Sequence, residues 1–182
     1  LLLATGSVPF MIPMPGHDHP DVISFRDIAD VRRMLEPSAT LPRVVVLGGG
    51  LLGLEAANGL VKQGMAVTVV NDAAYLLNRQ LDEEASSLLR AALEAKGIVF
   101  KVSAVTSHIS HNADTGKLNA LHFKDGTELP CDLLVMAVGV RPNVALARSM
   151  GLQVDNAILV NDTLQTFDPR ASAVGECVQH RG

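Results

Sequence analysis

Apolar positions change their spacing along the chain, and each spacing predicts an element. A continuous apolar run at 44–47 indicates a strand that is buried on both faces of a parallel sheet, and a second apolar run at 67–70 indicates another strand. Between them, apolar residues recur at helical spacing as far as Gly64, where a glycine typically ends a helix. The stretch from Arg43 to Asp72 therefore predicts a strand, a helix and a second strand, which form a βαβ unit.

The pattern continues beyond this unit. It predicts a helix at 81–96 and a third parallel strand at 98–102. From 105 to 128 the apolar period changes to two, which indicates an antiparallel meander. An apolar strand at 133–138 then ends in Gly139, where a ligand could approach the backbone.

Two helices outside the βαβ unit have predicted apolar faces. The first follows Ser24 and Asp27, which resemble a capping box, and it stops before Pro37. Its face comprises Ile28, Val31 and Leu35, and the face of the helix at 81–96 comprises Ala85, Leu88, Leu89, Ala92 and Leu93.

Both ends of the chain are predicted to be largely extended. Residues 1–3 indicate a strand, and the prolines from Pro9 to Pro20 favour an extended crossover. A short helix follows Gly139 and ends at Met150. Strand-like stretches then occur at 157–160, 163–166 and 173–176. We expect three segments along the chain, at 1–20, 21–160 and 161–182.

Three glycines at the junction of the first strand and helix match the pattern G-x-G-x-x-G. Gly48 permits a tight turn, Gly50 lets a pyrophosphate approach the backbone, and Gly53 lets the helix pack close to the strand. The helix N-terminus adds unpaired N–H groups and a positive dipole end. Within a βαβ unit this motif predicts dinucleotide binding.

The end of the second strand departs from the pattern for NAD. An acidic residue is expected there to bind the ribose 2′-hydroxyl, but the chain has Asn71, followed by Asp72. An amide lacks the charge that repels the 2′-phosphate of NADP, and Arg79 lies one loop away. The choice between NAD and NADP stays open, with a slight preference for NADH expected from the charge of Asp72.

Composition narrows the classes of function. The chain has 182 residues, of which 48% are hydrophobic, and a formal net charge of −4. It can bury a sizeable core, but it has no basic stripe for nucleic acid. Its apolar runs are shorter than the 18 or so residues of a membrane span, and its first residues do not resemble a signal peptide. We therefore expect no membrane or nucleic-acid partner and a cytoplasmic location.

The cysteines and histidines do not predict a metal site. Cys131 and Cys177 lie far apart and form no C-x-x-C motif, which excludes a redox-active vicinal disulfide or a four-cysteine site in this stretch. A solvated loop or an exposed sheet face accounts for His17, His19, His108, His111 and His122.

The order of the strings ATGS, GGGLLGLEAA, AVGVRPN and AVGE resembles the two-dinucleotide flavoprotein reductases of the pyridine nucleotide-disulfide oxidoreductase superfamily. Within it, RQLDEEA, VNDTLQTFDP and VGECVQHRG look like the large subunit of siroheme-containing NAD(P)H nitrite reductases. The resemblance implies an α/β fold. A Rossmann-like NAD(P)-binding domain, with a parallel sheet and an antiparallel β-meander, would be flanked by short pieces of an FAD domain.

The resemblance also implies roles for individual residues. Gly48, Gly50 and Gly53 would cradle the NAD(P)H pyrophosphate, Glu55 would lie near the nicotinamide carboxamide, and Gly139 would approach the cofactor. The expected cofactor-binding residues are Gly48, Gly49, Gly50, Leu51, Leu52, Gly53, Glu55, Asn71, Asp72, Arg79 and Gly139, with Thr5, Gly6, Gly175 and Glu176 on the FAD side. Spacing alone leaves Glu176 open between an FAD contact and a helix cap.

The implied function is to position nicotinamide for hydride transfer to FAD, in an enzyme that reduces nitrite to ammonia in nitrate assimilation. No residue of this chain need act as an acid or base. Siroheme and a [4Fe–4S] cluster would lie elsewhere in the parent protein, and an FAD G-x-G-x-x-G is expected upstream of Leu1. The expected partners are the FAD domain and downstream redox domains, with a homodimer left open, and the fragment alone should be inactive. The alternatives are an NADH-dependent rubredoxin or ferredoxin reductase and a non-catalytic dinucleotide sensor.

Overall fold

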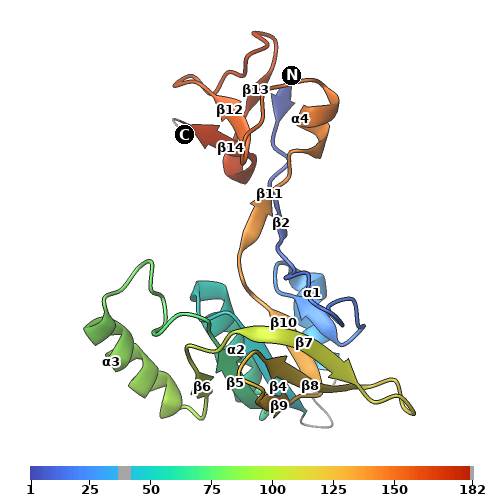
Figure 1. Ribbon diagram of the computed structural model, residues 1–182. Helices are drawn as coiled ribbons and strands as arrows, with labels where there is room; N and C mark the ends of the chain where they lie inside the picture. Colours follow the sequence, from blue (N-terminus) through green and yellow to red (C-terminus); the bar gives the residue numbers. More distant parts are fainter. Residues whose placement is uncertain (37–41, 181–182) are drawn as a thin grey trace. The chain divides into compact units, whose positions relative to one another are not determined.

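The computed structural model describes residues 1–36 and 42–180 (Figure 1). Its contacts divide the chain into two compact units. We call Phe10–Gly139 the sheet unit, and Leu1–Pro9 together with Val140–Gly182 the terminal unit.

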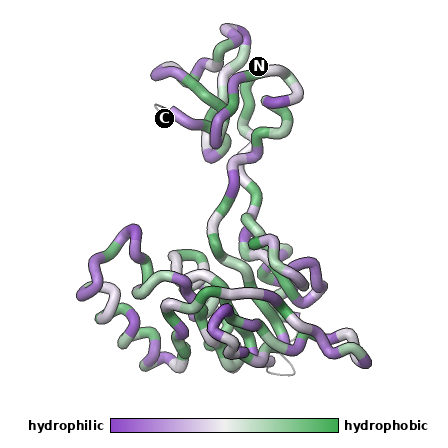
Figure 2. Tube along the Cα trace, in the orientation of Figure 1, coloured by the Kyte–Doolittle hydropathy of each residue, from purple (hydrophilic) through white to green (hydrophobic). Residues whose placement is uncertain are grey.

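A five-stranded parallel sheet forms the centre of the sheet unit. Its strand order is β3-β10-β4-β5-β6. The strands are β3 (Val22–Ser24), β10 (Leu133–Met136), β4 (Arg43–Leu47), β5 (Ala66–Val70) and β6 (Val99–Lys101). Val44 lies level with Leu133 on one side and with Val67 on the other, so the predicted apolar runs are the central strands. These strands are strongly hydrophobic (Figure 2) because both faces of the sheet are covered.

Helices cover one face of this sheet and a meander covers the other. Val44 and Val46 of β4 join the core with α2 (Leu51–Lys62), whereas Val45 and Leu47 join the core with the meander. Residues from α1 (Ile28–Leu35) and α3 (Glu83–Glu94) join the helical side. The meander consists of the antiparallel strands β7 (Thr106–His111), β8 (Leu118–Phe123) and β9 (Glu128–Pro130). This arrangement confirms the predicted fold class.

The terminal unit is small and has its own apolar core. Its paired strands are β1 (Leu2–Leu3) with β13 (Ser172–Ala173), β2 (Ser7–Pro9) with β11 (Val140–Pro142), and β12 (Ile158–Val160) with β14 (Val178–His180). It also contains α4 (Ala145–Ser149) and the 3₁₀ turn η2 (Gly175–Cys177). Leu3, Ile158 and Cys177 lie at its centre. The stretch 163–166 is not a strand, since only an isolated bridge joins Gln165 to Ser172.

The contact boundaries differ from the limits expected at 20/21 and 160/161. Residues 10–20 belong to the sheet unit because their loop packs on the meander, where Ile109 N donates to the Pro15 carbonyl at 2.9 Å. Residues 140–160 belong to the terminal unit because β11 pairs with β2 and β12 with β14. The functional assignment of these segments stays a prediction.

Helix α1 corrects two details of the sequence analysis. Its capping box is formed by Asp27 and Asp30, because Asp27 Oδ1 accepts from Ala29 N and Asp30 N at 2.8 and 3.0 Å. Ser24 instead donates its hydroxyl to the Asp30 carboxylate at 3.1 Å. The face predicted to be buried is largely exposed, with Ile28 at 71%, and Met34 makes the contact with the core. The predicted stop at Pro37 lies outside the described residues.

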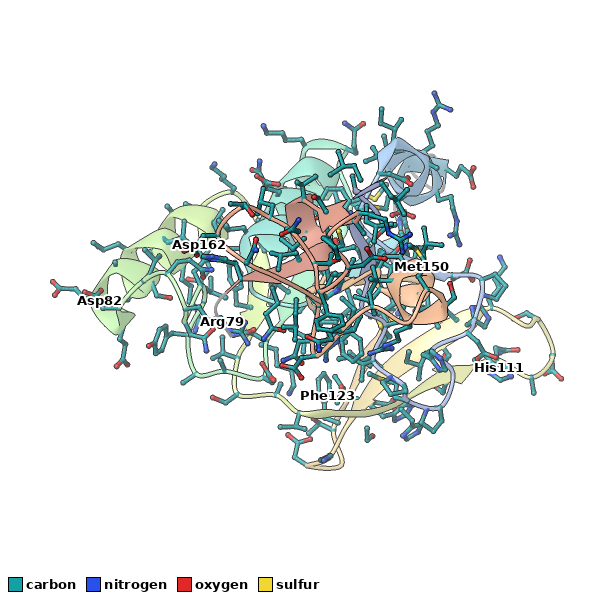
Figure 3. The ribbon with its side chains drawn as sticks, turned by 90° about the horizontal axis from the view of Figure 1, so that it is seen from above. Arg79, Asp82, His111, Phe123, Met150 and Asp162 are labelled. Atoms are coloured by element: carbon teal, nitrogen blue, oxygen red, sulfur yellow. The ribbon has the colours of Figure 1, made fainter. Side chains whose placement is uncertain are left out.

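The predicted buried face of helix α3 is confirmed in part. Leu93 is buried and Leu89 packs against the core as expected, but Leu88 is 71% exposed and Ala92 is exposed. Ser86 takes the second buried position. Asp82, at the N-terminal end of this helix, accepts a hydrogen bond from Ala85 N at 2.8 Å and caps it (Figure 3).

Candidate functional site

A cavity of about 640 Å³ lies at the carboxyl ends of β4, β5 and β10. The carboxyl edge of a parallel sheet is where open α/β folds bind ligands, and this volume suits a small-molecule site. Nine of the predicted residues line it, namely Gly48, Gly49, Gly50, Leu51, Leu52, Asn71, Asp72, Arg79 and Gly139.

Glycine occurs at each position of the turn between β4 and α2 for a different structural reason. Gly48 has a φ of 118°, and a Cβ there would collide with the Ala137 carbonyl oxygen of β10. At Gly53 a Cβ would collide with the Gly48 carbonyl oxygen, so this glycine lets α2 pack close to the turn. Gly50 differs, because a Cβ there would meet no atom within 4 Å. The protein therefore does not require glycine at position 50 for its own packing.

Gly50 is the N-cap of α2, and the first turn of this helix faces the cavity. Gly50, Leu51 and Leu52 all line the cavity, and both leucines are exposed. The first N–H groups of a helix have no carbonyl one turn earlier to accept their hydrogen bonds. Together with the positive end of the helix dipole, these groups make the N-terminus of α2 suitable for a phosphate.

The amide of Gly49 is held by the protein itself. Its N–H donates to Asn71 Oδ1 at 3.1 Å, and its carbonyl accepts from Leu77 N at 3.0 Å. A Cβ on Gly49 would lie 2.9 Å from Asn71 Cγ and 2.9 Å from Leu76 Cδ2. Gly49 is therefore a packing residue at the wall of the cavity, and its N–H is already occupied.

Asn71, at the end of β5, is 8% exposed and makes three side-chain hydrogen bonds. Besides accepting from Gly49 N, its Nδ2 donates to the carbonyls of Ala73 and Tyr75 at 3.3 and 3.0 Å. The loop that follows β5 is thereby tied to the glycine turn.

Two opposite charges lie at the rim of the cavity. Asp72 and Arg79 are both exposed and both line it. Within residues 1–36 and 42–180, neither side chain takes part in a hydrogen bond or ion pair. Arg79 lies on the segment that leads into α3 (Figure 3).

Six predicted residues are not part of this lining. Gly53 is buried beneath the turn, and Glu55 lies on the exposed side of α2, so its predicted contact with nicotinamide stays a prediction. Thr5, Gly6, Gly175 and Glu176 belong to the terminal unit. There the Glu176 carboxylate accepts from Ser7 Oγ at 2.8 Å, and Thr5 Oγ1 donates to the Asn143 carbonyl at 2.6 Å.

Sequence reasoning missed part of the cavity wall. Phe10 and Ile12 line it from the proline-rich segment, and Ala104 to Thr106 line it where the chain enters β7. The available signal for Phe10 and Ile12 was their apolar character within a proline-rich stretch. No local pattern marked residues 104–106.

Among the described residues, no cysteine or histidine lines the cavity. Over the described residues, no group of three or more histidine, cysteine, aspartate or glutamate residues is arranged to hold a metal ion. His108 and His122 stack with ring centroids 4.2 Å apart on the meander. Burial, helped by the nearby Asp132, raises the pKa of the Cys131 thiol to about 12, so this thiol stays protonated and unreactive. None of the described helices has the length and apolarity needed to cross a membrane.

Comparison with known proteins gives one consistent family. The model of the family described as pyridine nucleotide-disulphide oxidoreductase matches residues 1–182. The nitrite reductase [NAD(P)H] of Bacillus subtilis is 48% identical over 100% of this chain and 22% of that protein. The rubredoxin-NAD(+) reductase of Pseudomonas putida is 33% identical over 100% of this chain and 46% of that protein. A solved ferredoxin reductase from Rhodopseudomonas palustris superposes with a TM-score of 0.93 at 33% identity, covering 100% of this chain and 45% of that one. The chain thus spans between about a fifth and a half of the length of these relatives.

Proposed function

We propose, from the premise that this chain belongs to the pyridine nucleotide-disulphide oxidoreductase family, that it binds NAD(P)H in the cavity of the sheet unit and positions it for reaction with FAD. The observation that carries the proposal is the open space beside the backbone of Gly50. Every other glycine of the turn is required by packing, whereas position 50 is open and lies at a helix N-terminus that faces the cavity. A pyrophosphate fits that combination of space, N–H donors and dipole.

Residues of the terminal unit fit a second cofactor, FAD. Gly6 and Gly175 have φ values of 64° and 83°, and a Cβ on either would meet no atom within 4 Å, so the backbone is accessible at both places. Glu176 presents an exposed carboxylate that can accept hydrogen bonds from hydroxyl groups as it does from Ser7. When both cofactors are bound, nicotinamide supplies a hydride and the flavin accepts it, while this chain supplies orientation.

The finer proposal is that the full-length protein is a nitrite reductase. The nitrite reductase large subunit of Klebsiella oxytoca is 41% identical over 97% of this chain, in addition to the 48% identity to the Bacillus subtilis enzyme. Electrons would then pass to siroheme and a [4Fe–4S] cluster in other parts of the protein. The FAD domain and downstream redox domains would be the partners of this chain, and the expected cytoplasmic location stays a prediction.

A rubredoxin or ferredoxin reductase is the second candidate, and it is supported by likenesses at 33% identity. Both candidates use the same coenzyme site, so they differ in the electron acceptor. Nitrite-dependent oxidation of NAD(P)H and a siroheme absorption band in the full-length protein would support nitrite reductase. Their absence, together with rapid reduction of an added rubredoxin or ferredoxin, would favour the second candidate.

The first prediction tests the coenzyme site itself. In Gly50→Val the new methyl groups occupy the space that the pyrophosphate needs, but they meet no protein atom at the Cβ position. We expect the variant to fold and to lose at least about a hundredfold in NADH affinity, or about 2.7 kcal/mol, by fluorescence titration. The matched control is Gly59→Val on the same helix, where the Cβ also meets nothing and the residue does not line the cavity. A folded Gly50→Val protein with the affinity of the control would contradict the proposal.

A further inference from the structure

We infer that Asn71 is a positioning residue whose hydrogen bonds hold the turn between β4 and α2 in place. We infer further that Asp72 and Arg79, not Asn71, distinguish NADH from NADPH. The inference rests on the proposed coenzyme site. It assigns two tasks to different residues of the loop that follows β5: one residue holds the turn, and two others recognise the 2′ group of the ribose.

The hydrogen-bond network fixes the orientation of the Asn71 amide. Its oxygen faces the N–H of Gly49, and its nitrogen faces two carbonyl oxygens, those of Ala73 and Tyr75. The flipped amide would place oxygen against two acceptors and nitrogen against a donor. Both N–H groups of the amide are therefore used within the protein. The amide thus has no free N–H group to donate to a ribose.

The clamp closes on Gly49 from two sides. Asn71 binds the N–H of Gly49, and Leu77 N donates to the Gly49 carbonyl at 3.0 Å. Leu77 has a φ of 50°, a left-handed conformation that costs a leucine about 1–2 kcal/mol. Its own carbonyl accepts from Gln80 N and Leu81 N at 2.8 and 2.9 Å, which holds this conformation in place. The loop after β5 thus determines where the turn presents Gly50 to the cavity.

A carboxylate at position 71 would not fit this network. It would keep the contact with Gly49 N but would place a charged oxygen 3.0 Å from the Tyr75 carbonyl oxygen and 3.3 Å from that of Ala73. Two hydrogen bonds would become two repulsions at a buried position. The neutral amide is therefore required by the course of this loop.

The two charged side chains at the rim of the cavity, Asp72 and Arg79, recognise the 2′ group of the ribose. Arg79 can donate two hydrogen bonds to a 2′-phosphate, and Asp72 repels that phosphate while accepting hydrogen bonds from ribose hydroxyls. Both are exposed and line the cavity beside Asn71. Because their effects oppose each other, we expect the affinities for NADH and NADPH to lie within about tenfold, or 1.4 kcal/mol.

Coenzyme titrations of variants in the full-length protein separate the two tasks. Arg79→Ala should weaken NADPH about tenfold and change NADH by less than about twofold, whereas Asp72→Asn should favour NADPH. Lys96→Ala is the matched loss of a positive charge, because Lys96 is exposed and does not line the cavity. Unchanged NADPH affinity in Arg79→Ala would overturn the assignment of the 2′ group.

Asn71→Asp tests the clamp. We expect a lower melting temperature and about tenfold weaker binding of both coenzymes, with their ratio unchanged. Leu93→Ala is the control for simple loss of stability, because Leu93 is buried on α3 and does not line the cavity. It should melt lower but keep both affinities. An Asn71→Asp protein with the original melting temperature and a tenfold shift toward NADH would show that residue 71 reads the ribose. If the unaltered protein bound neither coenzyme, the proposed function itself would fail.

Discussion

Gly53 has no side chain because the carbonyl oxygen of Gly48 occupies the place that its Cβ would take. We expect Gly53→Ala to lower the free energy of unfolding by about 1–3 kcal/mol, since α2 would have to move away from the turn. Urea denaturation would measure this change. Gly59→Ala on the same helix should be neutral or slightly stabilising, because its Cβ enters open space and alanine favours helix. Equal stability of the two variants would contradict the role of Gly53.

Single residues also show how far the sequence predicted the site. The packing roles of Gly48 and Gly53 follow from the motif because each depends on a turn of fixed geometry, whereas the contact of Gly50 with a pyrophosphate stays a prediction. The role of Asn71 did not follow, since two of its partners are backbone carbonyls whose positions depend on the course of the loop. A sequence pattern specifies residue types but not where a loop directs its carbonyl groups.

At the scale of elements, an ion pair joins the first residue of β4 to the residue before β10. Arg43 Nε and Nη2 donate to the Asp132 carboxylate at 2.9 and 2.7 Å, and Arg43 N donates to it at 2.9 Å. The side-chain hydrogen bonds from Arg43 lower the pKa of Asp132. Both side chains are more than a third exposed, so solvent weakens their interaction.

We expect Asp132→Asn to cost only about 0.5–1 kcal/mol at neutral pH. Because the folded pKa of Asp132 is lowered, its contribution is present above the unfolded value of about 3.9 and is lost as the pH falls below it. Denaturant unfolding at several pH values should therefore show that the difference in free energy of unfolding between the two proteins becomes smaller in acid. A difference that grows in acid would contradict this account.

Elements also divide into those that the sequence predicts well and those that it does not. The strands at 44–47 and 133–136 are continuous apolar runs, the strand at 67–70 is apolar except for Thr68, and no competing periodicity obscures them. The helices were placed correctly along the chain, but the buried face was wrong for α1 and only partly right for α3. On α1 and α3, apolar residues occur on more than one face, and the core takes in Met34 from α1 and Leu93, with Leu89 packed against it, from α3. Tertiary packing decides which face is buried.

At the scale of the whole molecule, we predict that the 182-residue chain alone folds, binds NADH weakly and retains no FAD. Its sequence contains one G-x-G-x-x-G, which lies in the sheet unit, so the terminal unit has no such turn for the pyrophosphate of FAD. Without a flavin ring for nicotinamide to stack on, binding should rest on the adenosine and phosphate half of the coenzyme. We expect an affinity of roughly 10 μM to 1 mM by calorimetry. A yellow protein with stoichiometric FAD, or steady NADH oxidation by this chain, would contradict the prediction.

The first and last residues of the sheet unit are joined by one hydrogen bond, from Phe10 N to the Gly139 carbonyl at 2.9 Å. Immediately outside them, Pro9 lies opposite Val140 in the antiparallel pair of β2 and β11. In the terminal unit, therefore, residues 10–139 take the place of a hairpin turn. A two-residue Asn-Gly turn between Pro9 and Val140 would close the same ribbon. The sheet unit could therefore be gained or lost during evolution by insertion or deletion at a single β-turn of a host protein.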